Sequence, residues 1–575
     1  MQIAIAKRCL AGAVRAWLLT AVCSLFWAGA AHAAPKTPTA SDCEGLLNAT
    51  APTVQITTAQ AITGGSFTAP GSPRPMTGLP AFCRIAGFLH PSADSNIGFE
   101  VWLPLAGWNG RYEQVGNGGF AGNIVYAELA SGLTHGFVSA NTDDGHQGGD
   151  MGWMYAHPEK VLDFGYRSVH GTADAAKALV KALYGQQPDF SYFVGCSEGG
   201  REGLMEAQRY PEDFNGIIAG DPAQSMTHLI AEHTWNKQAM LLDPARTIPA
   251  AKADAIQAAV LAACDTAGDN VEDGVVGDPR ACRFDPKVLL CKGADSNSCL
   301  TAAQVQGLIL MYAGAHNPKS GVRQFAGFQP GSESDGDVFS MKLAVLGGPK
   351  SIDFGLGAPA YGALLLNNPA YDGLNFDFAV DVDRMDQLKV KDETLQAVFD
   401  ADDPAKLKAF LARGGKLIQY HGWADFGIAP YSALYYQSAM DSPALGKSVD
   451  ALQKNYRLFM VPGMHHCSGG PGPNAFGESS RSPSSTADAD HDIVLALQAW
   501  VEHGKAPEQI IAAKYKNDAP AQGVVYTRPL CAYPRTARYT GSGDKTDAKS
   551  FACVDEHLSV AANPGLSERL ERIKP

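Results

Sequence analysis

Residues 192–203 read Y-F-V-G-C-S-E-G-G-R-E-G, and the five residues Gly195–Gly199 fit the pattern G-x-S-x-G. The glycines allow a turn so tight that larger side chains would clash, and the strained backbone projects the central Ser197 outward. Tyr192–Val194, before the turn, is typical of a buried strand, and Arg201–Tyr210, after it, is typical of a helix. This stretch therefore predicts a strand, a sharp turn and a helix, with a reactive serine at the turn.

Further short apolar runs, several of which end in glycine-rich turns, predict the rest of a buried sheet. We expect strands at Phe99–Leu103, Arg111–Val115, Gly136–Ala140, Gly216–Gly220, Lys416–His421 and Tyr456–Pro462. Helical periodicity is found at Ala173–Tyr184 and at Ile493–His503, which Gly504 closes. The fold class predicted from this alternation is α/β.

The strand pattern lapses between about residue 226 and residue 384. This stretch has a helical signal at Ala250–Ala263, then a patch rich in Asp and Cys, then a region rich in Gly, Ser and Pro. We interpret residues 226–384 as an inserted domain that covers the core. The core itself is then divided into residues 34–225 and 385–575.

A serine nucleophile needs a base, and the base needs a carboxylate to orient it. On an α/β-hydrolase sheet these groups follow later strands in the order Ser, Asp or Glu, His. The strand at Lys416–His421 leads to Asp425, and the strand at Tyr456–Pro462 leads to His466. Ser197, Asp425 and His466 are therefore the predicted catalytic triad.

Other interpretations of these residues stay open at this point. Asp221 follows the strand Gly216–Gly220 and is the main rival of Asp425 as the orienting acid. His465 is more typical of a surface or supporting residue than of the base. Cys196 could be a thiol nucleophile, and Ser197 could be a simple turn residue.

Two cysteines flank the predicted triad, because Cys196 precedes Ser197 and Cys467 follows His466. If the serine and histidine lie within hydrogen-bond reach, their neighbours can approach the ~5.5 Å Cα separation that a disulfide requires. In the chain-entropy model a disulfide that closes so long a loop, from Cys196 to Cys467, stabilises the fold by at most about 5 kcal/mol. Such a bond would also hold the base against the nucleophile.

The tetrahedral intermediate of an acyl transfer needs two N–H donors for its oxyanion. One donor is the backbone N–H of the residue after the nucleophile, which is Glu198. The other is expected from the glycine loop Gly116–Gly119.

The first 33 residues predict a secretory signal peptide. Lys7 and Arg8 precede an apolar run at Trp17–Ala30, and the triplet Ala31–Ala33 offers a cleavage site, so that the mature chain begins at Ala34. No other stretch approaches the ~20 apolar residues of a membrane span. The protein is therefore expected to be secreted or periplasmic.

The cysteine content and the charge agree with export. Of twelve cysteines, Cys9 and Cys23 lie in the signal, and the even number that remains implies disulfides in an oxidising compartment. The formal net charge of −13 argues against nucleic acid as a partner. We expect a monomer or a dimer that binds a small ester substrate.

The chain resembles the tannase and feruloyl esterase family of α/β-hydrolases, whose signature is a Cys-Ser, Asp, His-Cys arrangement. The similar stretches are Tyr192–Gly203, Tyr420–Asp425 (YHGWAD), Val461–Gly472 (VPGMHHCSGGPG), Cys531–Asp544 (CAYPRTARYTGSGD) and Phe551–Cys553 (FAC). The resemblance implies Ser197 as nucleophile, His466 as base, Asp425 as its orienter and a Cys196–Cys467 disulfide. It also implies Gly119 as the second oxyanion donor.

The resemblance further implies a lid domain, inserted after the sixth strand, that holds a structural Ca²⁺. Alternating carboxylates and carbonyls suit this cation. The corresponding ligands are Asp265, Asp269, Val271, Asp273 and Val275. The disulfides implied in the same way are Cys43–Cys83, Cys264–Cys282, Cys291–Cys299 and Cys531–Cys553.

Members of the family hydrolyse galloyl and hydroxycinnamoyl esters, and a close relative hydrolyses mono(2-hydroxyethyl) terephthalate with a lid arginine on the free carboxylate. Between Arg323 and Arg384 the only cations of this chain are Lys342 and Lys350, and a lysine lacks the bidentate fork. We therefore expect a neutral phenolic acyl group, with the terephthalate monoester as the alternative. Trp235 and Phe426 are the expected ring contacts. A catalytically silent binding protein on the same fold is an alternative of another class.

Overall fold

The computed structural model describes residues 36–49, 52–120, 122–331, 333–334, 340–346, 351–368, 370–479 and 482–555. The predicted signal peptide and Lys350 lie outside these residues. No helix in the described part of the chain is long and apolar enough to cross a membrane.

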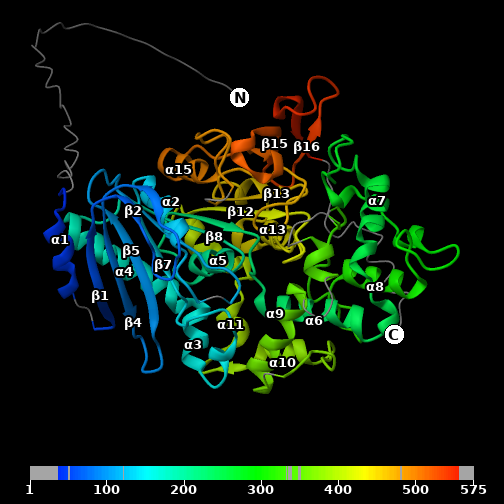
Figure 1. Ribbon diagram of the computed structural model, residues 1–575, viewed down its shortest axis with the longest axis horizontal. Helices are drawn as coiled ribbons and strands as arrows, with labels where there is room; N and C mark the ends of the chain where they lie inside the picture. The colour runs from blue at the N-terminus through cyan, green and yellow to red at the C-terminus, as the bar shows by residue number, and fades with distance from the viewer. Residues whose placement is uncertain are drawn as a thin grey trace, which may run out of the picture.

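A nine-stranded sheet forms the centre of the molecule, in the order β1-β4-β5-β7-β6-β8-β9-β12-β13 (Figure 1). The strands are β1 (Val54–Ile62), β4 (Phe82–Leu89), β5 (Ile97–Pro104), β7 (Val138–Thr142), β6 (Arg111–Val115), β8 (Phe190–Cys196), β9 (Gly216–Gly220), β12 (Lys416–Gly422) and β13 (Tyr456–Val461). From β7 to β13 they run parallel, so their carboxyl ends meet at one edge. The predicted fold class is confirmed.

Successive side chains of the central strands enter two different hydrophobic clusters. Ile217 of β9 packs on the face covered by α4 (Ser168–Tyr184) and α5 (Glu198–Arg209). Ile218 packs on the opposite face with Leu497 and Trp500 of α15 (Ile493–His503). Because strand side chains alternate between faces, two layers of helices must cover this sheet.

A helical segment separates β9 from β12 in the chain and lies beside the sheet (Figure 1). Its principal helices are α6 (Met226–Leu241), α7 (Ala253–Cys264), α8 (Ala302–Ala313), α9 (Ile352–Tyr361) and α10 (Asp381–Gln387). Its first helix begins where the predicted insertion begins, and α10 runs across the predicted boundary at residue 384. The division into domains stays a prediction.

Several antiparallel strands are present that the apolar runs did not indicate. They are β1 and β4, the pair β2 (Gly65–Phe67) and β3 (Met76–Leu79), the pair β14 (Gln509–Tyr515) and β15 (Val524–Cys531), and the pair β16 (Thr536–Tyr539) and β17 (Phe551–Val554). Most of these strands expose one face, and their apolar residues do not form continuous runs.

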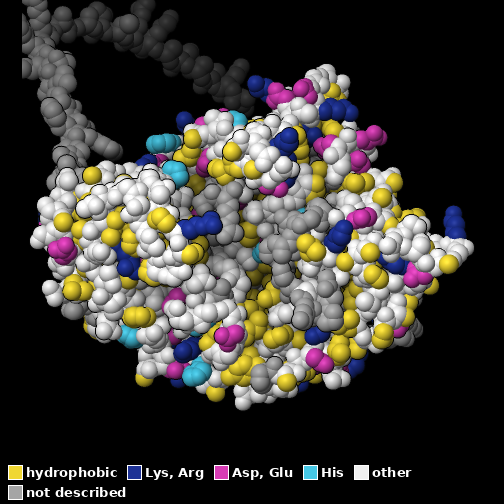
Figure 2. All heavy atoms as spheres, viewed as in Figure 1, with side chains coloured by type: hydrophobic (Ala, Val, Ile, Leu, Met, Phe, Trp, Pro, Cys, Tyr) yellow, Lys and Arg dark blue, Asp and Glu magenta, His cyan; other side chains and the backbone are white. Residues whose placement is uncertain are grey.

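The outer face seen in Figure 2 carries Lys and Arg side chains scattered among acidic and apolar ones.

Candidate active site

The tight turn around Ser197 has the geometry predicted from its glycines. Strand β8 ends at Cys196, α5 begins at Glu198, and Ser197 between them has a φ of 66°. A Cβ atom at Gly195 would collide with the backbone of Gly199. The positive φ strains a serine, and such strain is typical of functional turns.

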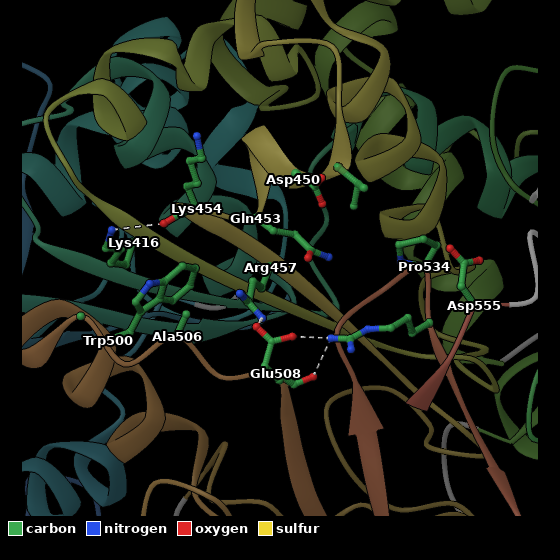
Figure 3. Close-up of a pocket in the computed structure, with 13 residues that line it drawn as sticks. Lys416, Asp450, Gln453, Lys454, Arg457, Trp500, Ala506, Glu508, Pro534 and Asp555 are labelled. Carbon is green, nitrogen blue, oxygen red and sulfur yellow. Dashed lines mark hydrogen bonds and ion pairs between the residues drawn. The ribbon is translucent and has the colours of Figure 1, made fainter. Parts of the chain in front are cut away.

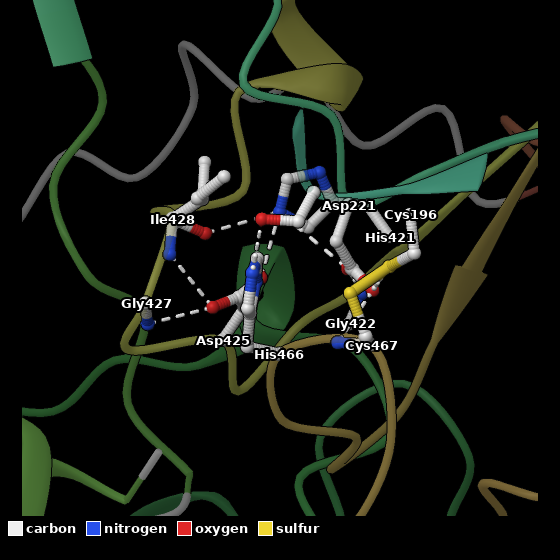
Figure 4. The surroundings of a disulfide bond; sticks show 10 residues. Cys196, Asp221, His421, Gly422, Asp425, Gly427, Ile428, His466 and Cys467 are labelled. Carbon is white, nitrogen blue, oxygen red and sulfur yellow. Dashed lines mark hydrogen bonds and ion pairs between the residues drawn. A yellow bond between two sulfur atoms is a disulfide. The ribbon is translucent and has the colours of Figure 1, made fainter. Parts of the chain in front are cut away.

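Three side chains from three strand ends form a continuous hydrogen-bonded line. The Nε2 atom of His466 lies 2.8 Å from Ser197 Oγ, and its Nδ1 atom lies 2.8 Å from Asp425 Oδ2. The other oxygen of Asp425 accepts the N–H groups of Gly427 and Ile428, at 2.7 and 2.8 Å (Figure 4). The structure thus brings the three predicted residues together.

The protonation of this line follows from its charges. Burial raises the pKa of Asp425, but the charge of His466 and the hydrogen bonds from both histidines outweigh burial and hold the pKa below its ordinary range. Burial lowers the pKa of His466, and the Asp425 carboxylate outweighs burial and raises it. An ionised Asp425 accepts a hydrogen bond from the Nδ1–H group, which leaves Nε2 of the neutral ring as an acceptor for the serine hydroxyl.

Asp221, the rival acid, has a different set of partners. Its oxygens accept the N–H groups of Gly422 and Cys467, at 2.7 and 2.9 Å. Burial raises its pKa to about 6, against the charge of His421. It therefore joins the end of β12 to the histidine loop, while Asp425 contacts the ring of His466.

Two further histidines lie near the line. His421 lies 3.5 Å from Asp425 and 3.7 Å from Asp221, and its Nδ1 atom is 2.8 Å from Ser432 Oγ. His465 is fully buried, which excludes the surface alternative and leaves that of a supporting residue, and His466 is the ring in contact with Ser197.

The disulfide between Cys196 and Cys467 is present, with a Cα separation of 5.9 Å across 271 residues of sequence (Figure 4). A cysteine in this bond cannot be a thiol nucleophile. The four other pairs named from the resemblance also form, namely Cys43–Cys83, Cys264–Cys282, Cys291–Cys299 and Cys531–Cys553.

The two expected oxyanion donors are available. Glu198 is the first residue of α5, so its N–H points out of the positive end of a helix. Gly119 lies in the glycine loop after β6 and has a φ of 63°. Within the described residues neither N–H group donates to a protein acceptor.

The two expected ring contacts differ in their surroundings. Phe426 directly follows Asp425, is buried, and packs against Phe328 of the helical segment with ring centroids 4.9 Å apart. Trp235 on α6 donates its indole N–H to Leu310 and packs against Phe378. Phe426 therefore joins the triad loop to the helical segment, whereas the contacts of Trp235 are internal to that segment.

The loop expected to bind Ca²⁺ gathers carboxylates with few cations. Asp269 is buried, and burial together with the charges of Asp273 and Asp265 raises its pKa to about 7. Asp273 pairs with Arg528 at 2.6 Å, and Asp265 accepts the N–H of Gly274 at 2.9 Å. Such a concentration of hard oxygen donors fits a divalent cation.

A surface pocket of about 630 Å³ lies at the opposite end of the strands, near Lys416, Arg457 and Trp500. Glu508 bridges Arg457 and Arg535, at 2.8 and 2.6 Å, and Figure 3 shows Glu508 beside Arg457. Lys416 begins β12, whereas Asp425 follows the end of that strand. Ligands of parallel sheets bind beyond the carboxyl ends of the strands, so this pocket is separate from the triad.

Comparison with known proteins identifies relatives over most of the chain. Residues 83–554 match the family model described as tannase and feruloyl esterase. An uncharacterized esterase of Xanthomonas campestris is 44% identical over 530 residues, which are 89% of this chain and 91% of the relative. A probable feruloyl esterase B-2 of Aspergillus flavus is 33% identical over 458 residues, which are 78% of this chain and 83% of the relative.

The crystal structure of feruloyl esterase B from Aspergillus oryzae matches with a TM-score of 0.79 at 29% identity, over 90% of this chain and 100% of that one. The fold is therefore that of an α/β-hydrolase. The chain belongs to the tannase and feruloyl esterase family, and it is a carboxylic ester hydrolase.

Proposed function

We propose that this protein is a secreted serine esterase that hydrolyses esters of hydroxycinnamic or gallic acids through Ser197, His466 and Asp425. The observation that carries the proposal is the pair of 2.8 Å contacts that His466 makes with the serine hydroxyl and with a buried carboxylate. Each contact joins the atoms that a serine hydrolase requires.

In this mechanism His466 Nε2 takes the proton of Ser197 as Oγ attacks the ester carbonyl. Asp425 stabilises the imidazolium that forms, and the N–H groups of Glu198 and Gly119 bind the oxyanion. The alcohol leaves with the proton of His466. A water molecule, deprotonated by the same ring, then hydrolyses the acyl-enzyme.

Aromatic side chains of the loop after Asp425 and of the helical segment support an aromatic acyl group. Phe426 contacts Phe328, and Phe325 of the helical segment stacks on Tyr431 with ring centroids 5.0 Å apart. Lys342 is paired with Asp254 at 3.0 Å, so this lysine is not free to bind the carboxylate of a terephthalate monoester. The names of the feruloyl esterase relatives support the same substrate class.

Export and a structural Ca²⁺ complete the proposal. Five disulfides support an oxidising destination after cleavage before Ala34. Asp265, Asp269, Asp273 and the carbonyls of Val271 and Val275 would hold the cation, which would neutralise the loop's charge. N-terminal sequencing of exported protein should begin at Ala34, and chelation should lower the melting temperature without unfolding the sheet.

The test of the function is a set of initial rates on methyl ferulate, methyl gallate and mono(2-hydroxyethyl) terephthalate, with Ser197→Ala as control. We expect a phenolic ester to react fastest and the variant to lose all measurable activity. Fastest turnover of the terephthalate monoester would contradict the phenolic preference alone. An active Ser197→Ala variant, or no reaction of Ser197 with a fluorophosphonate, would contradict the triad.

A further inference from the structure

Asn117 connects the glycine loop to three other parts of the core. Its backbone carbonyl accepts the N–H of Gly199 on α5 at 2.8 Å. Its backbone N–H donates to Glu202 Oε2 at 3.1 Å, and its side-chain Nδ2 donates to Asp144 Oδ2 at 2.7 Å. Asn141 donates to its Oδ1 at 3.1 Å. Both the backbone and the side chain of this buried residue are thus held.

The acids that hold Asn117 belong to a buried group with unbalanced charge. Asp144, Glu198 and Glu202 are at most 3% exposed, and Arg201 is the one guanidinium among them. Arg201 is hydrogen-bonded to Glu198. Asp144 also accepts the hydroxyl of Ser168 at 3.1 Å. Asp144 and Glu202 are left as neighbouring carboxyls without a cation of their own, and like charges so placed cannot both ionise.

We propose that Asn117 positions the oxyanion hole, and that a proton shared between Asp144 and Glu202 holds Asn117 in place. This inference rests on the proposed triad and oxyanion donors. Gly119 lies two residues after Asn117, and Glu198 immediately precedes the Gly199 that Asn117 binds. The contact between Asn117 and Gly199 therefore joins the two segments that supply the N–H donors.

The glycine loop and the start of α5 approach so closely that the loop has little room to move. A Cβ atom at Gly116 would lie 2.5 Å from the Cα of Gly199 and 2.8 Å from Glu202 Oε2. Any side chain there would push the loop from the helix. A displacement of about 1 Å in such a site costs about 100-fold in rate.

The shared proton gives this arrangement a dependence on pH. Burial, and then the charge of Glu198, raise the pKa of Glu202 to about 8, and burial raises the pKa of Asp144 well above its ordinary value. The charged groups that face the pair are Glu198 and Arg201 on α5. As the pH rises through these raised pKa values, the pair loses first one proton and then the shared one, which leaves two neighbouring anions. The loop should then shift, and kcat should fall on the alkaline side.

The first test is Asn117→Ala in the full-length protein, with methyl ferulate as substrate. We expect kcat to fall by about 100-fold and KM to change by less than about threefold, because the donors bind the transition state rather than the ester. A wild-type kcat in this variant would overturn the inference. If Ser197→Ala were active, the proposed triad would fail instead, so the two failures are distinguishable.

The second test keeps the shape of the site and removes its proton. Glu202→Gln can still accept the N–H of Asn117 and can donate to Asp144, so we expect nearly wild-type kcat at pH 7 and loss of the alkaline decline. Glu206→Gln is the matched control, because Glu206 is equally buried on the same helix but faces Asp213. An alkaline decline unchanged by Glu202→Gln, or removed equally by Glu206→Gln, would overturn the role of the shared proton.

Discussion

Buried acids lie on both sides of Ser197, and their neighbours shift their pKa values in opposite directions. On the side of the base, Asp425 is ionised because two histidines and two backbone N–H groups face it. Behind the nucleophile, Asp144 and Glu202 face each other with no cation of their own, and their pKa values are raised. Burial is equal in the two regions, so the neighbouring groups decide whether an acid carries charge. In the mechanism we propose, Asp425 is an electrostatic partner for catalysis, and Asp144 and Glu202 support the oxyanion hole.

The largest expected effect comes from removing the charge on the side of the base. In Asp425→Asn the amide can keep the hydrogen bonds of Gly427 and Ile428, but it cannot stabilise the imidazolium. We expect kcat to fall by about 10³ to 10⁴-fold. Steady-state rates on methyl ferulate measure this, with circular dichroism to establish that the variant is folded. A loss below about tenfold would show that another carboxylate orients His466.

The second-largest effect is expected from the Cys196–Cys467 disulfide, which joins the two regions. In the double variant Cys196→Ala/Cys467→Ala the base and nucleophile lose their covalent link, and we expect kcat to fall by about 100-fold. The free energy of unfolding should fall by at most about 5 kcal/mol. The matched control is Cys291→Ala/Cys299→Ala, which removes a half-buried disulfide that closes a short loop of the helical segment. Equal losses of kcat in both variants would contradict a local role.

A smaller effect is expected for Asp221, which is as buried as Asp425 but does not contact the ring of His466. Asp221→Asn keeps one oxygen for the N–H of Gly422 and replaces the oxygen that accepts the N–H of Cys467 with an NH₂ group, which cannot accept it. We expect the free energy of unfolding to fall by about 1 to 2 kcal/mol and kcat by less than tenfold. Urea unfolding and steady-state rates measure both. A loss of kcat as large as that of Asp425→Asn would contradict the assignment of the two acids.

The smallest expected effect is a shift in the pH at which kcat/KM declines on acidification. The pKa of His466 is raised, so its inactive protonated form persists to higher pH, and kcat/KM should fall on acidification through a pKa above the ordinary value of about 6.5. In Asp425→Asn the midpoint of this decline should move to lower pH. Rates between about pH 5 and 9 measure it. A midpoint that Asp425→Asn leaves unchanged would assign the decline to another group.

The parts of the fold that the sequence predicted best are those buried on both faces. The apolar runs at Arg111–Val115 and Gly216–Gly220 coincide with β6 and β9, because glycine punctuation marks the ends of continuous hydrophobic strands. Strand β1 was missed, since its residues alternate between exposed and half-buried positions and pair only with the equally unnoticed β4. The C-terminal pairs were missed for a similar reason.

Within the site, motifs predicted the residues of the proposed triad but not those that we propose support it. Ser197, Asp425 and His466 each follow a strand at a recognisable turn, and the structure brings them together. Asp144 and Glu202 come together only because β7 and β6 are neighbours in the sheet while α5 packs beside β8. No local sequence pattern predicts such a contact. It could have been suggested only by assuming the strand order of an α/β-hydrolase sheet, which places the ends of β6, β7 and β8 side by side.

The register between β9 and β12 has a consequence for how this molecule can change over evolutionary time. Ile217 pairs with Leu417 and Ile218 with Ile418, as in consecutive strands, although the whole helical segment lies between them in the chain. Closing a longer connection costs little, about 0.6 kcal/mol for each doubling of length. The segment can therefore lengthen, shorten or be exchanged while the strand ends that carry Ser197, Asp425 and His466 keep their places. Related chains can therefore acquire new substrates through changes in this segment while they keep the same residues at the strand ends.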